Sequence, residues 1–455
     1  MNCSSALDPE SDRLIRSARR QMFLDFCALL EREQIHYAIL AGYSGYPERI
    51  DSDVDFVVAE RDFDRIATLF LRRGCIPGAR LIQLLEHETT ARYFVFAQKV
   101  GSRLAYLHPD AAAGVRKDDR LWLTSRDVLS TRRRSAAGFW IPAAKVEFQY
   151  YFVKRVEKGL LEQRHLAALA ALQREDPPGC RAALAKLVDP RSIETLTSRI
   201  RAEDLAWFRG HGPLLRKQVM ASKPLEGPLA RWRSRLVGAV RIGRRIVRPT
   251  GLVVAVLGPD GSGKTTVLNH LERELAPAFR QVRRFHLRPR FGRNQEGGAV
   301  VDPHGQSARG WLLSSLKILM FVVDFAWGWS RIVWPAAMRS TLVLFDRYFH
   351  DLLVDPVRYR LPSEFFPARW AASLIPTPHL WLVLTAPAPT LVERKNEITL
   401  QAAAALNVRY EALAASLSDA VLINTGQPID VVLGQAVEAV CQFLAARTAS
   451  RLSTN

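Results

Sequence analysis

The stretch LVVAVLGPDGSGKTTV, residues 252–267, constrains the fold of this chain more than any other segment. Residues 252–257 are all apolar, as in a strand that is buried on both faces of a parallel sheet. The spacing G-x-x-x-x-G-K-S/T follows at once, in Gly258, Gly263, Lys264 and Thr265. Apolar residues then recur on one helical face: Val267, Leu268, Leu271, Leu275 and Ala276. The order of strand, glycine-rich loop and helix predicts a phosphate-binding loop.

Such a loop suits a nucleoside triphosphate for electrostatic reasons. Glycines let successive backbone N–H groups turn toward a polyphosphate, and the start of the helix adds positive potential. Lys264 can reach the outer phosphates, and the Thr265 hydroxyl can bind Mg²⁺. A turn without a ligand is the alternative, but the complete motif in its strand and helix context favours ATP or GTP. The predicted ATP-binding residues are Gly258, Gly261, Ser262, Gly263, Lys264, Thr265 and Thr266.

The 455 residues are too many for one ordinary domain and predict three segments. Residues 249–455 form an α/β domain, because the strand-like runs 282–287, 341–345, 380–384 and 420–423 alternate with helical stretches. This alternation predicts a doubly wound parallel sheet with its ligands at the carboxyl ends of the strands. Residues 144–248 read as helical, with Asp189-Pro190 as a helix start, and residues 1–143 form a separate domain.

The last domain resembles the thymidylate kinase family of P-loop kinases. The resemblance rests on GPDGSGKTT, a long apolar helix, DRY at residues 346–348 and LTAPAPTLVERKNEIT. It implies ATP as the phosphate donor, with Asp346 organising Mg²⁺ and Arg347 holding the acceptor phosphate or the group in transfer. It also implies that Arg394, with Lys395 beside it, supplies a transition-state arginine from a lid, since Gly261 occupies the alternative position within the loop. The implied acceptor-binding residues are Asp260, Arg288, Phe325 and Tyr348.

The acceptor side departs from this family in two places. Phe325 stands where the family reads thymine with an arginine, and a missing donor leaves a base carbonyl unpaired. After DRY the chain continues as FHDLLVDPVRYR, whose charged residues are His350, Asp351, Asp355, Arg358 and Arg360. We therefore expect a kinase with an intact donor side and a rebuilt acceptor side, acting on dTMP, a related nucleotide or a sugar phosphate.

In the first 143 residues, two predicted strands, 35–40 and 54–58, bracket a turn at Gly42, and Asp53 and Asp55 alternate at the start of the second strand. This part of the chain thereby resembles the nucleotidyltransferase (polymerase beta-like) superfamily, which implies an α+β fold. Alternation places both carboxylates on one face, where they can bind Mg²⁺. A third carboxylate is not evident; the stretch RLAYLHPD offers His108 and Asp110. Nucleotidyl transfer to a sugar or phosphate is therefore an alternative function.

The chain has a formal net charge of +19, and seven arginines cluster between residues 231 and 248, a stretch without an acidic residue. Apolar residues interleave with them and predict a basic amphipathic helix. Such a helix either contacts a membrane surface or polyanion, or packs its apolar face on a neighbouring domain; its place before a domain boundary favours packing. No motif predicts specific nucleic-acid binding.

The remaining features predict a soluble cytoplasmic enzyme. The five cysteines are scattered without metal-like spacing, and the N-terminus lacks the features of a signal peptide. No run approaches the roughly 20 apolar residues of a membrane span. The family resemblance also implies a homodimer. A third alternative is a nucleotide-dependent switch without an acceptor substrate.

Overall fold

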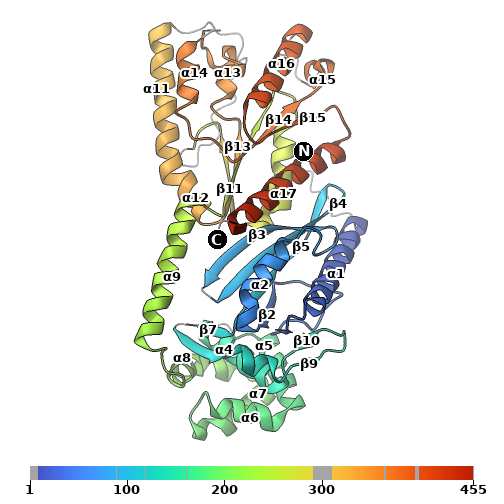
Figure 1. Ribbon diagram of the computed structural model, residues 1–455, viewed down its shortest axis with the longest axis vertical. Helices are drawn as coiled ribbons and strands as arrows, with labels where there is room; N and C mark the ends of the chain where they lie inside the picture. Colours follow the sequence, from blue (N-terminus) through green and yellow to red (C-terminus); the bar gives the residue numbers. More distant parts are fainter. Residues whose placement is uncertain are drawn as a thin grey trace. The chain divides into compact units, whose positions relative to one another are not determined.

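The computed structural model describes residues 9–88, 90–117, 119–159, 161–289, 310–362, 365–394 and 399–453. The chain divides into two compact units (Figure 1). Unit 1 comprises Met1–Gln98, Ala105–Arg241 and Ala449–Asn455; unit 2 comprises Lys99–Leu104 and Ile242–Thr448. The division falls within helix α9 (Pro228–Val247). The three-segment division from the sequence stays a prediction.

Unit 1 is built on a mixed sheet in the order β1-β2-β6-β4-β3, with β5 beside β4. Its strands are β1 (Tyr37–Ile39), β2 (Val54–Val58), β3 (Ala79–Glu88), β4 (Ala91–Val100), β5 (Arg103–Leu107) and β6 (Pro109–Ala112). Strand β1 pairs antiparallel with β2, and β6 pairs parallel with β2. Two hairpins, β7 (Val115–Lys117) with β8 (Arg120–Leu123) and β9 (Arg133–Arg134) with β10 (Trp140–Ile141), lie outside this sheet. Helices α1 (Pro9–Arg32), α2 (Glu60–Leu71) and α3 (Ser125–Leu129) complete this part.

The helices of residues 144–221 share one apolar core within unit 1. They are α4 (Ala144–Lys158), α5 (Gln163–Glu175), α6 (Pro177–Ala185), α7 (Ile193–Arg201) and α8 (Leu205–Ala221). Aspartates cap two of these helices by accepting hydrogen bonds from backbone N–H groups that would otherwise lack a partner. Asp176 accepts from Gly179, and Asp204 accepts from Trp207. Asp189, predicted as a helix start, caps the 3₁₀ turn Pro190–Ser192 that leads into α7.

Unit 2 contains a parallel five-stranded sheet in the order β12-β13-β11-β14-β15. The strands are β11 (Leu252–Leu257), β12 (Gln281–His286), β13 (Thr341–Asp346), β14 (Leu380–Thr385) and β15 (Ala420–Asn424). The five predicted strands are therefore present. From β11 the chain crosses to β12 at one edge and returns to β13 beside β11, and β14 and β15 then follow on the other side. The connections between parallel strands place helices on both faces of such a sheet, and ligands bind where the strand order reverses, next to β11.

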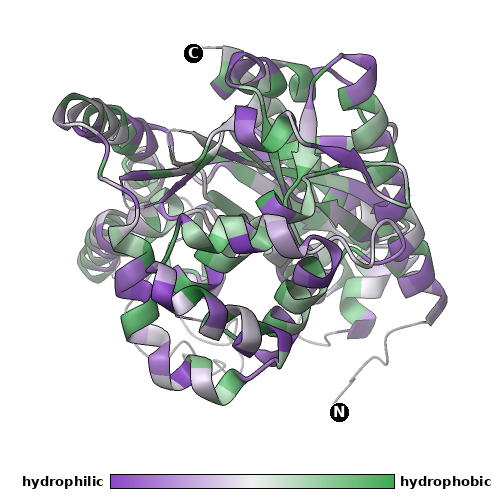
Figure 2. Ribbon diagram, turned by 90° about the horizontal axis from the view of Figure 1, so that it is seen from below, coloured by the Kyte–Doolittle hydropathy of each residue, from purple (hydrophilic) through white to green (hydrophobic). Residues whose placement is uncertain are grey.

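Helices flank this sheet (Figure 1). They are α10 (Lys264–Leu275), α11 (Trp311–Gly328), α12 (Trp334–Met338), α13 (Asp351–Val354), α14 (Phe366–Ala372), α15 (Ala388–Arg394), α16 (Leu400–Ser416) and α17 (Ile429–Ser453). A π-helical segment (Trp329–Val333) joins α11 to α12. Hydrophobic and hydrophilic residues mix around the helices (Figure 2), as expected where one side of a helix covers a core.

Two of the described helical stretches are long and apolar enough to cross a membrane, although the sequence has no continuous run of roughly 20 apolar residues. They are Trp311–Met338 and Ile429–Leu452. The first contributes Ile318, Phe321 and Phe325 to the core of unit 2, so one of its faces packs inside the domain. Its other side exposes Leu312, Leu319 and Trp327 among others. The first stretch therefore packs one face on the core and exposes apolar side chains on the other.

Candidate active site

The phosphate-binding loop lies between β11 and α10, as the sequence predicts. Gly258 ends β11 with a φ of +147°, and Gly261 and Gly263 have φ values of +82° and +84°. These conformations favour glycine because other residues meet a Cβ clash there. At Gly258 a Cβ would also lie 2.5 Å from the carbonyl oxygen of Leu384. Helix α10 then begins at Lys264 with its free N–H groups at the loop.

Lys264 is the only lysine of this loop, and its side chain is buried. Its Nζ donates hydrogen bonds to the carbonyl oxygens of Gly258 at 2.8 Å and Pro259 at 2.7 Å. Burial, together with the positive charge of Arg347, lowers the pKa of Lys264 to about 7. An anion in this loop would reverse that shift, because a nearby negative charge favours the ammonium form.

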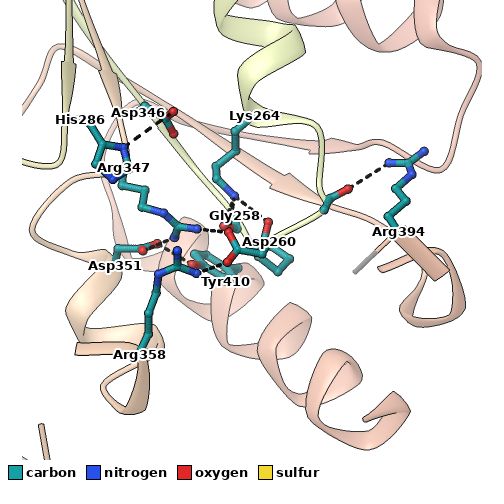
Figure 3. A network of polar contacts seen from close by, with 12 residues as sticks. Gly258, Asp260, Lys264, His286, Asp346, Arg347, Asp351, Arg358, Arg394 and Tyr410 are labelled. Carbon is teal, nitrogen blue, oxygen red and sulfur yellow. Dashed lines mark hydrogen bonds and ion pairs between the residues drawn. The ribbon is translucent and has the colours of Figure 1, made fainter. Parts of the chain in front are cut away.

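A network of arginines and carboxylates lies beside the loop (Figure 3). Arg347 donates to both Asp260 and Asp351, and Arg358 donates to Asp260. Burial alone would raise the pKa of Asp260, but Arg347, Lys264 and Arg358 outweigh it and hold that pKa well below its usual range. Both arginines are therefore oriented by carboxylates before any substrate arrives.

Asp351 is fully buried and holds the centre of this network. It accepts hydrogen bonds from the hydroxyl groups of Tyr359, at 2.8 Å, and Tyr410. Burial would raise the pKa of Asp351, but Arg347 and these hydroxyl groups outweigh it and lower the pKa. Arg347 itself has a φ of +68°, a strained conformation for a residue with a side chain, and its N–H donates to the Val256 carbonyl. Backbone strain of this kind concentrates at functional sites.

Asp346 ends β13 directly beside β11, where the parallel register pairs it with Val256. Arg284 lies 3.2 Å from its carboxylate, and His286 Nδ1 lies 3.9 Å away. Burial would raise the pKa of Asp346, but His286, Lys264 and Arg284 outweigh it and lower the pKa, so the carboxylate is charged at neutral pH. A carboxylate and the Thr265 hydroxyl are oxygen ligands of the kind that Mg²⁺ prefers, and both line one cavity. These residues fit a magnesium site.

The cavity has a volume of about 610 Å³. Its lining contains ten of the predicted residues: Asp260, Gly261, Ser262, Gly263, Lys264, Thr265, Thr266, Asp346, Arg347 and Arg394. Arg394, the last residue of α15, is exposed and donates to the Gly261 carbonyl at 3.1 Å. Ser262 Oγ is buried and has no hydrogen-bond partner in the described part of the chain. Lys395, proposed as a second lid residue, falls outside the described residues.

Three described residues that the sequence predicts at the acceptor lie outside the lining of this cavity. Phe325 and Tyr348 are fully buried in the core of unit 2, where their rings pack against each other at 4.9 Å. Arg288 instead makes an ion pair with Asp324 at 2.7 Å. Phe325 faces the core because it shares the buried face of α11 with Ile318 and Phe321. Acceptor contact by these three residues gains no support from the structure.

Sequence reasoning missed other members of the site. Tyr410 lies on α16 and Arg284 on β12, and neither belongs to a motif. Arg358 appeared only as part of a charged stretch, although it reaches the cavity and Asp260. The buried residues of α16 are Ala403 and Tyr410, which lie seven positions apart on one face of the helix. The helical periodicity of this segment could therefore have predicted that Tyr410 faces inward.

Unit 1 has a second cavity, of about 580 Å³, lined by Asp53, Asp55 and Asp110. The register places Asp110 on β6 beside Asp55 on β2. Lys154 Nζ lies 2.6 Å from Asp55, and Tyr93 donates to Asp53 at 2.9 Å. Among the described residues, no three His, Cys, Asp or Glu side chains are arranged to hold a metal ion. Because the Lys154 ammonium already pairs with Asp55, a metal ion at Asp55 would have to displace it.

Comparison with known proteins places part of this chain near thymidylate kinases. No protein-family model matches the chain. A thymidylate kinase of Xanthomonas campestris pv. campestris is 30% identical over 146 residues, which is 32% of this chain and 61% of the relative. A probable thymidylate kinase of Pyrobaculum aerophilum is 26% identical over 142 residues, 29% of this chain and 62% of the relative.

A solved thymidylate kinase from Candida albicans is 16% identical, with a TM-score of 0.31, over 42% of this chain and 91% of that structure. The chain spans about three fifths of the length of the curated relatives it matches. About a third of the chain is therefore similar to thymidylate kinases, which supports a thymidylate kinase-like P-loop domain within it.

Proposed function

We propose that unit 2 catalyses ATP-dependent, Mg²⁺-requiring transfer of a phosphoryl group to a small phosphorylated acceptor. The observation that carries the proposal is one cavity lined by Lys264, Thr265, Asp346, Arg347 and Arg358. A phosphoryl group in transfer needs its negative charge stabilised more than it needs covalent chemistry. Similarity to thymidylate kinases supports a nucleotide kinase.

Each group has a task in this reaction. The loop amides and Lys264 hold the donor phosphates, while Thr265 and Asp346 would hold Mg²⁺. Bound Mg²⁺ would neutralise charge on the donor phosphates. Arg347 and Arg358 present guanidinium groups, whose planar forks match phosphate oxygens. An acceptor phosphate would compete with Asp260 for these arginines, so binding of the acceptor would loosen their contacts with Asp260.

The acceptor is dTMP, a related nucleotide or a sugar phosphate. Two arginines beside the loop favour an acceptor that already carries a phosphate. Phe325 cannot donate a hydrogen bond to thymine and is fully buried, which favours an acceptor other than dTMP.

The proposal is tested by measuring ADP formation from MgATP with dTMP, other nucleoside monophosphates, sugar phosphates and no acceptor. We expect turnover that depends on one acceptor class and is absent in Lys264→Ala. ATP binding without acceptor-dependent turnover would contradict the proposal and favour the nucleotide switch.

The lowered pKa of Lys264 predicts that nucleotide affinity depends on pH. The free protein has a pKa of about 7 at this lysine, whereas bound phosphates favour the charged form. Binding therefore takes up a proton above pH 7, and affinity falls as pH rises. We expect the Kd for MgATP to rise by roughly twentyfold between about pH 7.5 and pH 9. Displacement of a fluorescent nucleotide measures it, and Lys264→Arg, which does not titrate in this range, should remove the dependence.

A second candidate function is nucleotidyl transfer in unit 1. The observation that favours it is the position of Asp110 beside Asp55, in the cavity that also contains Asp53. Release of pyrophosphate from nucleoside triphosphates by Lys264→Ala, lost on adding Asp55→Asn, would support it. No release with any triphosphate tested would count against it. The homodimer and the cytoplasmic location stay predictions.

A further inference from the structure

Helix α9 presents an apolar stripe to solvent rather than burying it. Leu229, Trp232, Leu236, Val240 and Val247 recur at helical spacing on one side of the helix. All five are exposed, with exposed fractions of 79% for Leu229, 64% for Trp232 and 73% for Val247. An exposed apolar face leaves this helix open to the membrane contact that the sequence offers as the alternative to packing on a neighbouring domain.

Arginines occupy much of the rest of the circumference, together with the exposed Val237, Ile242 and Ile246. At 100° per residue, Arg244 lies about 70° from the centre of the stripe on one side and Arg235 about 110° from it on the other, and both are exposed. Arg231, Arg241 and Arg245 lie on the opposite side, and residues 227–248 contain no acidic residue. This combination of a continuous apolar stripe and an arginine-rich polar face is the pattern of helices that lie in a membrane interface.

We propose that α9 binds the surface of an anionic lipid bilayer, with its apolar stripe among the acyl chains and its arginines at the headgroups. Charge complementarity selects this partner. A second copy of α9 would oppose arginine with arginine, and a nucleic acid would contact the arginines but leave the apolar stripe in water. An anionic bilayer can contact both the arginines and the apolar stripe, because acyl chains lie directly beneath its negatively charged headgroups. Arg235 and Arg244 can extend from the edges of the stripe to the headgroups.

The test is flotation of the full-length protein with phosphatidylcholine vesicles, with and without phosphatidylglycerol. We expect binding to the anionic vesicles to exceed binding to the neutral ones by at least about tenfold. Leu236→Asp with Val240→Asp should reduce it about tenfold or more, because charge then enters the acyl layer. Arg235→Glu with Arg244→Glu should reduce it similarly, and added salt should weaken the wild type.

Matched variants keep the assignment specific to α9. Leu214→Asp and Arg209→Glu alter exposed residues of α8, and Leu319→Asp alters the exposed side of α11. All three should bind anionic vesicles as the wild type does, and circular dichroism should show unchanged helix content in every variant. Three outcomes would overturn the proposal. The protein would not bind anionic vesicles, the α8 or α11 variants would lose as much vesicle binding as the α9 variants, or Leu236→Asp with Val240→Asp would leave vesicle binding unchanged. The last result would identify a polyanion site alone.

Discussion

Arg394→Ala should lower kcat of the proposed kinase by about 10³, with little change in the KM for ATP. Arg394 lines the cavity at the end of α15, and its guanidinium donates to the Gly261 carbonyl. The resemblance to thymidylate kinases implies that Gly261 stands where an arginine of the loop would act, so we expect the charge that stabilises the phosphoryl group to come from Arg394. The measurement is steady-state ADP formation with the acceptor found in the panel.

The control separates catalysis from folding. Arg394 is exposed, so its loss should change the free energy of unfolding by no more than about 0.5 kcal/mol. Arg339→Ala removes another exposed arginine of unit 2 outside the cavity lining and should leave kcat unchanged. Arg394→Lys should recover only part of the rate, because an ammonium lacks the planar fork of a guanidinium. An unchanged kcat in Arg394→Ala would remove this residue from the catalytic assignment.

The donor half of the site could be predicted from the sequence because its signals are local. Residues 252–257 form a continuous apolar run, and β11 has those bounds in the structure. The glycine spacing predicts the phosphate-binding loop. Asp346 and Arg347 stand at the end of a second apolar strand. The loop could be inferred from neighbouring residues alone, whereas the roles of Asp346 and Arg347 come from the resemblance to thymidylate kinases.

The acceptor half depends on contacts that no local pattern specifies. Tyr410 reaches Asp351 from a helix that begins after β14, and Arg358 reaches Asp260 from a 3₁₀ turn. The resemblance to thymidylate kinases implies that Phe325 contacts the acceptor, but the phase of α11 turns its side chain into the core. In unit 1, Asp110 lies beside Asp55 because of the register between β6 and β2. The sequence around either residue does not specify this register.

Arg347→Ala should reduce the stability of unit 2 as well as remove acceptor-dependent turnover. Its guanidinium is buried and pairs with Asp260 and with Asp351, which is fully buried. Removing the cation leaves a buried carboxylate without its ion-pair partner, which typically costs about 3–5 kcal/mol. Hydrogen exchange of β13 peptides, read by mass spectrometry, measures this loss within unit 2.

The cause can be tested through Asp351. In the wild type the pKa of Asp351 is lowered, so its contribution to stability is present above the unfolded carboxyl pKa and is lost as pH falls through the folded value. Without Arg347, burial would raise that pKa, and protonation would relieve the unpaired charge. The stability difference between wild type and Arg347→Ala should therefore narrow from pH 7.5 to about pH 5.

Asp351→Asn in the Arg347→Ala background should recover stability at neutral pH, because the neutral amide carries no buried charge. Arg358→Ala is the matched comparison, since Arg358 is only half-buried and pairs with Asp260 alone among the described carboxylates. It should cost less stability than Arg347→Ala and show little change on adding Asp351→Asn. A loss in Arg347→Ala that neither low pH nor Asp351→Asn relieves would show that packing, and not the buried charge, governs the stability of this network.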